Sequence, residues 1–141
     1  MLTLTQIELV QSSFAIIAPI ADDAASLFYR RLFEIDPSLE QMFKGDMADQ
    51  RRKLMQMLTA AVKELPRLDR LVPIVEDLGR RHAGYGVTDE HYDTVGAALI
   101  WTLEKGLCTA FTPAVKEAWT CVYGVLASTM KNAAARELSA A

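Results

Sequence analysis

The chain has 141 residues, of which 51% are hydrophobic and 23% charged, and its formal net charge is -3. This composition is typical of a globular protein, and the length fits one compact domain over residues 1–141. The acidic balance argues against a nucleic-acid binder, which needs a basic face.

The N-terminal third of the chain predicts two helices. Apolar residues recur at helical spacing here and throughout the chain, and no alternating run indicates a strand, so we expect an all-α fold. Thr5 and Glu8 have the spacing of a capping box at the start of a first helix that runs to about Pro19. The second helix must end before Asp36-Pro37, because the residue before a proline is disfavoured in the helical region.

The middle of the chain predicts two further helices. The first covers about residues 47–64 and places Gln50 on an otherwise apolar stripe. The second begins near residues 71–73 and carries His82 at the end of its apolar face. The Gly84-Tyr85-Gly86 segment should end it, because glycine accepts the left-handed conformation that closes a helix.

Two helices are expected in the C-terminal part. Thr88 can cap the first, and Thr112 with Pro113 has the pattern that starts the second. Beyond Asn132 we expect the alanine-rich tail to fray. No repeat, linker or nucleotide-binding motif is recognisable, so any electron source must be another protein.

Cysteine usage and the absence of targeting patterns bear on location. Cys108 and Cys121 form no CxxC pair and have no histidine at zinc spacing, so we expect two buried thiols in a reducing compartment. No secretory signal opens the sequence, and no stretch is expected to reach the roughly 20 apolar residues of a membrane span. The expected location is cytoplasmic, with neither a membrane nor nucleic acid as partner.

His82 is the candidate metal ligand. A lone histidine on an apolar helix face is more often a hydrogen-bonded core residue, although imidazole is the commonest metal ligand in proteins. His91 is not at i, i+4 spacing from it and carboxylates do not cluster with either residue, which disfavours zinc or di-iron. Haem requires only one protein ligand, because the porphyrin supplies four nitrogens.

Three other side chains could complete a gas-binding haem pocket. Phe43, after a corner that starts with proline, suits a wedge against the haem ring, or is an ordinary core aromatic. Tyr29 and Gln50 carry polar groups at the ends of side chains that lie on otherwise apolar helix faces. Each polar group either reaches water or donates a hydrogen bond to a bound gas. Bound oxygen carries partial negative charge, so each donor would contribute roughly 1.5–3 kcal/mol, whereas carbon monoxide would gain less.

The chain resembles the bacterial single-domain haemoglobins and the globin domain of flavohaemoglobins over nearly its whole length. The resemblance rests on six stretches, namely residues 28–33, 37–43, 50–55, 78–82, 90–96 and 118–124. It implies a globin fold, a three-over-three helical sandwich around haem b, with His82 as the proximal iron ligand. The residues that it places at the haem are His82, Phe43, Tyr29, Gln50, Leu54, Leu78, Tyr92 and Val95.

The proximal side departs from the flavohaemoglobin pattern. Tyr92 matches the tyrosine of their proximal network, but Ala134 stands where that network has a glutamate. The departure weakens the case for peroxidase-like or fully flavohaemoglobin-like chemistry. His82 is expected instead to donate its free N–H to the carbonyl of Leu78, which would fix the tautomer.

Two functions share the expected site. The first is reversible binding of O2, and also of CO and NO, for oxygen binding or delivery. The alternative is an enzyme, a nitric oxide dioxygenase that detoxifies NO with a separate reductase as partner. A cofactor-free helical bundle leaves the pairing of Tyr29 and Gln50 opposite His82 unexplained, and no output domain for a gas sensor is recognisable.

Overall fold

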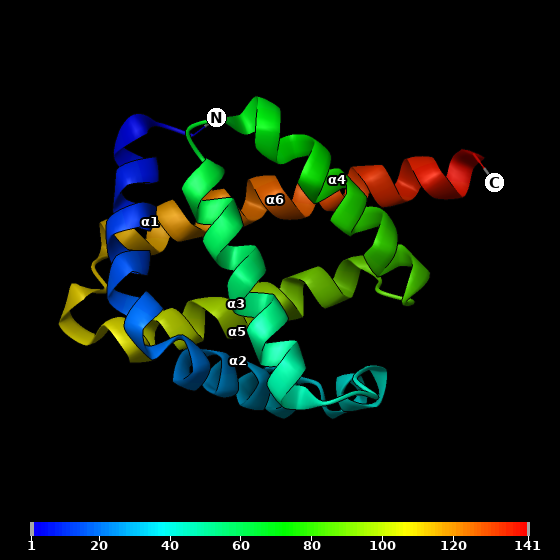
Figure 1. Ribbon diagram of the computed structural model, residues 1–141, viewed down its shortest axis with the longest axis horizontal. Coiled ribbons are helices and arrows are strands. Elements are labelled where there is room, and N and C mark those ends of the chain that lie inside the picture. Colours follow the sequence, from blue (N-terminus) through cyan, green and yellow to red (C-terminus); the bar gives the residue numbers. More distant parts are fainter. Residues whose placement is uncertain (1, 141) are drawn as a thin grey trace.

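The protein is described here by a computed structural model of residues 2–140, with side chains to residue 136 (Figure 1). The α-helices in this part of the chain are α1 (Leu4–Ile17), α2 (Ala21–Ile35), α3 (Met47–Glu64), α4 (Leu68–Gly84), α5 (Asp89–Leu107) and α6 (Pro113–Ala140). Three short 3₁₀ turns lie between them, namely η1 (Ala18–Ile20), η2 (Pro37–Met42) and η3 (Cys108–Ala110). Residues 2–140 contain no strand, which confirms the all-α prediction.

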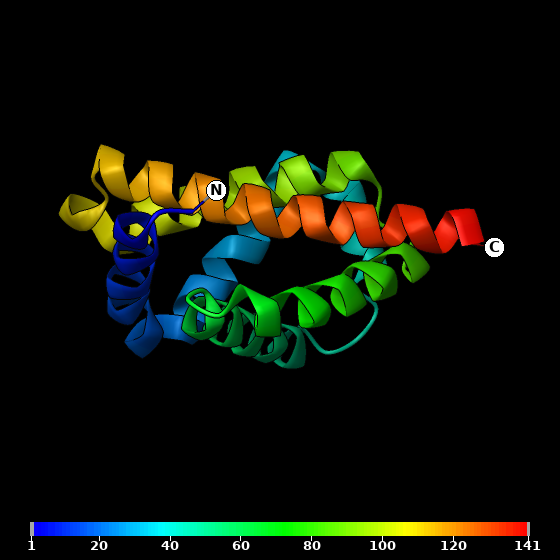
Figure 2. The same cartoon turned by 90° about the horizontal axis from the view of Figure 1, so that it is seen from above.

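The helices form two layers. Figure 2 shows α3 and α4 on one side of the molecule and α5 and α6 on the other, with α1 across one end. Helices far apart in the sequence lie together, because α4 packs on α6, α1 packs on α6, and α2 packs on α5. The buried apolar faces of these helices form one core. Helix α3 packs on α2 and also contacts α4.

The first helix begins earlier than the sequence predicted. Its capping box uses Thr3 and Gln6 rather than Thr5 and Glu8: the Thr3 hydroxyl accepts from the Gln6 amide at 3.1 Å, and the Gln6 side chain accepts from the Thr3 amide at 3.1 Å. Glutamine can occupy the third helical position of a capping box as glutamate does. The sequence therefore contains two overlapping candidate boxes, and the one with Thr3 and Gln6 forms. The predicted end of α2 and both predicted bounds of α3 are confirmed.

Two other helix ends differ from expectation. Helix α4 begins at Leu68, so Pro73 lies inside it, where it removes one backbone hydrogen bond without ending the helix. Helix α6 continues to Ala140, so the prediction of a frayed tail is wrong. Alanine has the highest helix propensity, and Arg136 forms an ion pair with Glu76 that ties this end of α6 to α4.

The stretch from Leu4 to Ile35 contains an 18-residue window with a mean hydropathy of 1.3, so by length and composition alone it could cross a membrane. The expectation that no such stretch exists is therefore wrong by the criteria of length and composition. In the structure, η1 with Pro19 divides the stretch into α1, of 14 residues, and α2, of 15 residues. Each helix is shorter than the roughly 20 residues of a span, and the two run in different directions (Figure 1).

The prediction of two buried thiols is also wrong. Cys108 is exposed and Cys121 is half-buried. Cys108 ends α5 with a positive φ of 50°, and its thiol donates to the carbonyl of Lys105 at 3.3 Å. The residue therefore belongs to a surface turn rather than to the apolar face of α5.

Helices α4 and α6 approach closely at Gly79. A Cβ atom at this position would lie 2.5 Å from the carbonyl oxygen of Met130 and 2.6 Å from its Cα. Both of these are backbone atoms, so a side chain at residue 79 could be accommodated only if the helices moved apart. The glycine thus permits α4 to rest directly on α6.

We predict that Gly79→Ala destabilises the fold by about 1–3 kcal/mol, because it overpacks this crossing. Thermal or urea unfolding followed by circular dichroism measures the change. Gly84→Ala is the matched control, since it lies on the same helix and a Cβ there meets nothing within 4 Å. Equal stability of the two variants would contradict the account of the α4–α6 contact.

Candidate functional site

His82 lies in the last turn of α4, and its ring is half-buried. Its Nδ1 is 2.8 Å from the carbonyl oxygen of Leu78, one turn earlier. A carbonyl only accepts, so Nδ1 carries the proton and Nε2 keeps a free lone pair. Burial lowers the pKa of His82 below its ordinary value of 6.5; the Leu78 hydrogen bond acts against this shift and the Arg81 charge acts with it. The imidazole is therefore neutral and its orientation fixed, as the sequence predicted.

Tyr29 and Gln50 come together from α2 and α3. The side-chain amide of Gln50 donates to the Tyr29 hydroxyl oxygen at 3.3 Å. Because this contact uses the oxygen of Tyr29, the phenol proton remains available to another acceptor. Burial raises the pKa of Tyr29 above its ordinary value of 10.0, and the hydrogen bond from Gln50 partly offsets the shift. Tyr29 is thus a protonated donor at neutral pH.

Aromatic rings surround the Tyr29 side chain. The Phe43 ring, at the end of the η2 corner, lies 5.4 Å from the Tyr29 ring in an edge-to-face arrangement, and the Phe28 ring lies 5.0 Å from it. Phe33 is 6.1 Å from Tyr29 and 5.6 Å from Phe43. Sequence reasoning did not select Phe33 as a site residue, although it follows Tyr29 by one helical turn. These rings bury the phenol, and this burial is the cause of the raised pKa of Tyr29.

The remaining predicted residues on α3, α4 and α5 are apolar and partly buried. Leu54 follows Gln50 by one turn of α3, Leu78 precedes His82 by one turn of α4, and Val95 lies on α5. All three side chains pack against the hydrophobic core. The described residues contain no cluster of three metal-ligating His, Cys, Asp or Glu side chains, so His82 is a single donor.

The region around Tyr92 on α5 is held by residues that sequence reasoning missed. Tyr92 is buried, and its backbone carbonyl accepts from the Tyr123 hydroxyl at 2.6 Å. A Cβ at Gly96 would meet the Tyr123 ring at 2.8 Å, so the glycine makes room for that ring. The ammonium group of Lys131 lies 5.6 Å from the centre of the Tyr92 ring. Burial, with a smaller effect of Asp89, raises the pKa of Tyr92.

The second histidine of the chain has a different role. The Nδ1 of His91 accepts from the backbone amide of Thr88 at 3.0 Å, and Thr88 in turn caps α5. The sequence predicted Thr88 as the cap but did not predict a histidine in the third position of its capping box. His91 is therefore engaged at a helix start.

Comparison with known proteins relates this arrangement to a family. The Globin family model matches residues 26–130. Flavohemoproteins of Bacillus subtilis and Vibrio cholerae are 30% and 31% identical over 124 and 130 residues, which cover 86% and 90% of this chain. The matched residues make up only 31% and 33% of the two flavohemoproteins, so the chain spans about a third of the length of these relatives.

The fold has a solved counterpart. A bacterial globin from Campylobacter jejuni matches with a TM-score of 0.84 and 24% identity, over 97% of this chain and 99% of that one. Its helices therefore have the same arrangement as the two layers described above. Together with the family match over most of the sequence, this shows that the chain belongs to the globin family.

Proposed function

We propose that this chain binds haem b through Nε2 of His82 and takes up a diatomic gas, O2 above all, beside Tyr29 and Gln50. The observation that carries the proposal is the Gln50–Tyr29 hydrogen bond of 3.3 Å, which leaves the phenol proton free among the aromatic rings of Phe28, Phe33 and Phe43. Membership of the globin family implies haem binding. The roles of the individual residues are our assignment.

The state of His82 suits an axial ligand. Its Nδ1–H is held by the Leu78 carbonyl at 2.8 Å and its pKa is lowered, so a neutral imidazole presents Nε2. Haem supplies an iron that binds small gases reversibly when it is ferrous and needs one protein nitrogen. A backbone carbonyl attracts the Nδ1 proton less strongly than a carboxylate does. The basicity of Nε2 in His82 is therefore raised less than it would be by a carboxylate partner. Ala134 in place of the flavohaemoglobin glutamate agrees with this assignment.

Tyr29 and Gln50 would discriminate among gases. A buried phenol donates more strongly to O2, whose outer atom gains negative charge on binding, than to the less polar CO. Hydrogen bonds to charged groups contribute roughly 1.5–3 kcal/mol, which corresponds to about ten- to a hundredfold in dissociation rate. The raised pKa of Tyr29 keeps this donor protonated through neutral and mildly alkaline pH.

A second candidate function is nitric oxide dioxygenation, which the similarity to two flavohemoproteins favours. In each turnover O2 and NO combine to nitrate with the uptake of one electron. This chain spans about a third of those relatives, and no nucleotide-binding motif is recognisable in it. We propose that a reductase outside these 141 residues supplies the electron if the chain acts as an enzyme.

The haem assignment predicts a strong Soret band in the purified protein that shifts on reduction with dithionite and again on addition of CO. In His82→Ala the band should be lost or altered. A low-spin bis-imidazole spectrum is not expected, because the proposed distal donors are Tyr29 and Gln50 rather than a histidine, and His91 caps α5. If the wild-type chain cannot be loaded with haem, the proposed function fails.

Tyr29→Phe should accelerate O2 dissociation by about ten- to a hundredfold and CO dissociation much less, since one charge-assisted hydrogen bond is removed. Stopped-flow ligand replacement measures both rates. Tyr85→Phe is the control, because it removes a phenol that is 68% exposed. Equal acceleration of both gases in Tyr29→Phe would overturn the hydrogen-bond argument.

The two functions differ in turnover. Under nitric oxide dioxygenation, the oxygenated protein should consume a single equivalent of NO, form nitrate and then stop until an electron donor is added. An NO electrode with nitrate analysis measures this before and after addition of a flavin reductase with its nicotinamide. If the donor restores no consumption, the protein is an oxygen binder under the tested conditions.

A further inference from the structure

Lys131 on α6 places a positive charge where α4, α5 and α6 meet. Its ammonium nitrogen lies over the Tyr92 ring of α5, 5.6 Å from the ring centre. The preceding residue, Met130, is the one whose backbone meets Gly79 of α4. His82 lies within one helical turn of Gly79, because an α-helix has 3.6 residues per turn. Lys131 therefore lies beside the last turns of the helix that carries the candidate ligand.

The Tyr92 ring holds the ammonium group in place. A cation within about 6 Å of a ring centre is attracted to the face of the ring, and more strongly where water is partly excluded. Lys131 is half-buried and Tyr92 is buried. Tyr92 is itself fixed, because the Tyr123 hydroxyl donates to its backbone carbonyl. The charge is thus kept against the protein rather than extended into solvent.

This charge is not neutralised by its neighbours. Among the side chains that the structure describes, no carboxylate forms an ion pair with Lys131. Asp89 and Asp93 act on Tyr92 and Tyr123, but both aspartates are exposed, so water screens them more than it screens the half-buried ammonium group. The raised pKa of Tyr92 keeps its phenol neutral. The field at this junction is therefore positive.

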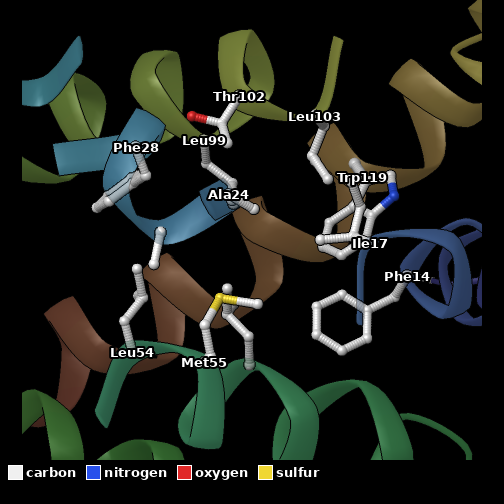
Figure 3. A pocket seen from close by; sticks show the side chains of 12 residues that line it. Phe14, Ile17, Ala24, Phe28, Leu54, Met55, Leu99, Thr102, Leu103 and Trp119 are labelled. Carbon is white, nitrogen blue, oxygen red and sulfur yellow. The ribbon is translucent and has the colours of Figure 1, made fainter. Parts of the chain in front are cut away.

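The interior further along α5 screens a charge only weakly. Figure 3 shows this region, where the labelled side chains of α2, α3 and α5 are mostly carbon. Its hydrogen-bonding side chains are engaged within the protein, because the Thr102 hydroxyl donates to the Ala98 carbonyl and the Trp119 indole donates to the Ser13 hydroxyl, each at 2.8 Å. Charges act more strongly through such an interior than through water. The effect of the Lys131 charge therefore extends beyond its contact with the ring.

Ferrous haem iron carries one positive charge less than ferric iron, so a positive charge nearby favours the ferrous form. We propose that the Lys131 ammonium group raises the reduction potential of haem held by His82 and thereby helps to keep the iron in the state that binds O2. Lys131 acts through its charge alone, without contact to the gas. The inference rests on the proposed function, because it requires haem at His82.

Spectroelectrochemical titration of the haem-loaded full-length chain tests the charge. Lys131→Met keeps an unbranched apolar stem, and at a fixed electrode potential it should lower the ratio of ferrous to ferric protein about threefold, or about 30 mV for a one-electron couple. Lys131→Glu should lower the ratio about tenfold, or about 60 mV. Lys131→Arg should retain the wild-type potential. A role in packing alone would not order the variants by charge.

Lys116→Met is the matched control, because it removes the same charge from the same helix. Lys116 is exposed, and the helical rise of 1.5 Å per residue places it roughly 22 Å from Lys131 along the axis of α6. Its variant should have the wild-type potential. Equal shifts in Lys116→Met and Lys131→Met, or a wild-type potential in Lys131→Glu, overturn the inference.

The contact between Lys131 and Tyr92 has its own test. In ¹H–¹³C NMR spectra of the diamagnetic ferrous CO complex, the ε-methylene protons of Lys131 should resonate upfield of those of Lys116, because they lie over an aromatic ring. Loss of the signal in Lys131→Met assigns it. Equal chemical shifts for the two lysines would show that the ammonium group is not held over the ring, and would overturn the inference.

The outcomes separate this inference from the proposed function. A chain that binds no haem refutes both. A chain that binds haem and O2 reversibly, with a reduction potential independent of the charge at residue 131, refutes the inference and leaves the proposed function intact.

Discussion

The close contact of α4 with α6 at Gly79 is the constraint on which the rest of the site depends. Because residue 79 lacks a Cβ, the backbone of α4 can lie against the backbone of Met130. Leu78, next to this contact, supplies the carbonyl that orients His82 one turn later. A single helix thus provides the anchoring contact, the hydrogen bond and the nitrogen donor. A shift of α4 would move all three together.

The surroundings of Tyr29 and Gln50 contain very few polar side chains. Tyr29 and Gln50 form one hydrogen-bonded pair, and aromatic rings from Phe28, Phe33 and Phe43 occupy the space around the phenol. Electrostatic interactions are stronger in such surroundings than in water, so a single free donor has a large effect. The strength of a hydrogen bond donated by Tyr29 therefore depends on the apolar character of its surroundings.

Local sequence patterns were sufficient for the helices and for part of the site. The bond from His82 to Leu78 spans one helical turn, so it follows from the helix itself. The Tyr29–Gln50 contact joins residues 21 positions apart, and the sequence could place both on apolar faces but could not give their separation. The Tyr123–Tyr92 hydrogen bond joins residues 31 positions apart, so the role of Tyr123 likewise emerges only from packing.

Pro73 illustrates how such an unexpected feature affects behaviour as well as shape. It lies inside α4, where its missing N–H leaves the early part of the helix with fewer backbone hydrogen bonds than the turns around His82. Local opening costs less where fewer bonds and contacts must be broken, and it does not require the whole chain to unfold. Amide protons at the start of α4 should therefore exchange with solvent sooner than those near its end. Helix α4 thus combines a more labile first part with a more stable last part, which carries His82.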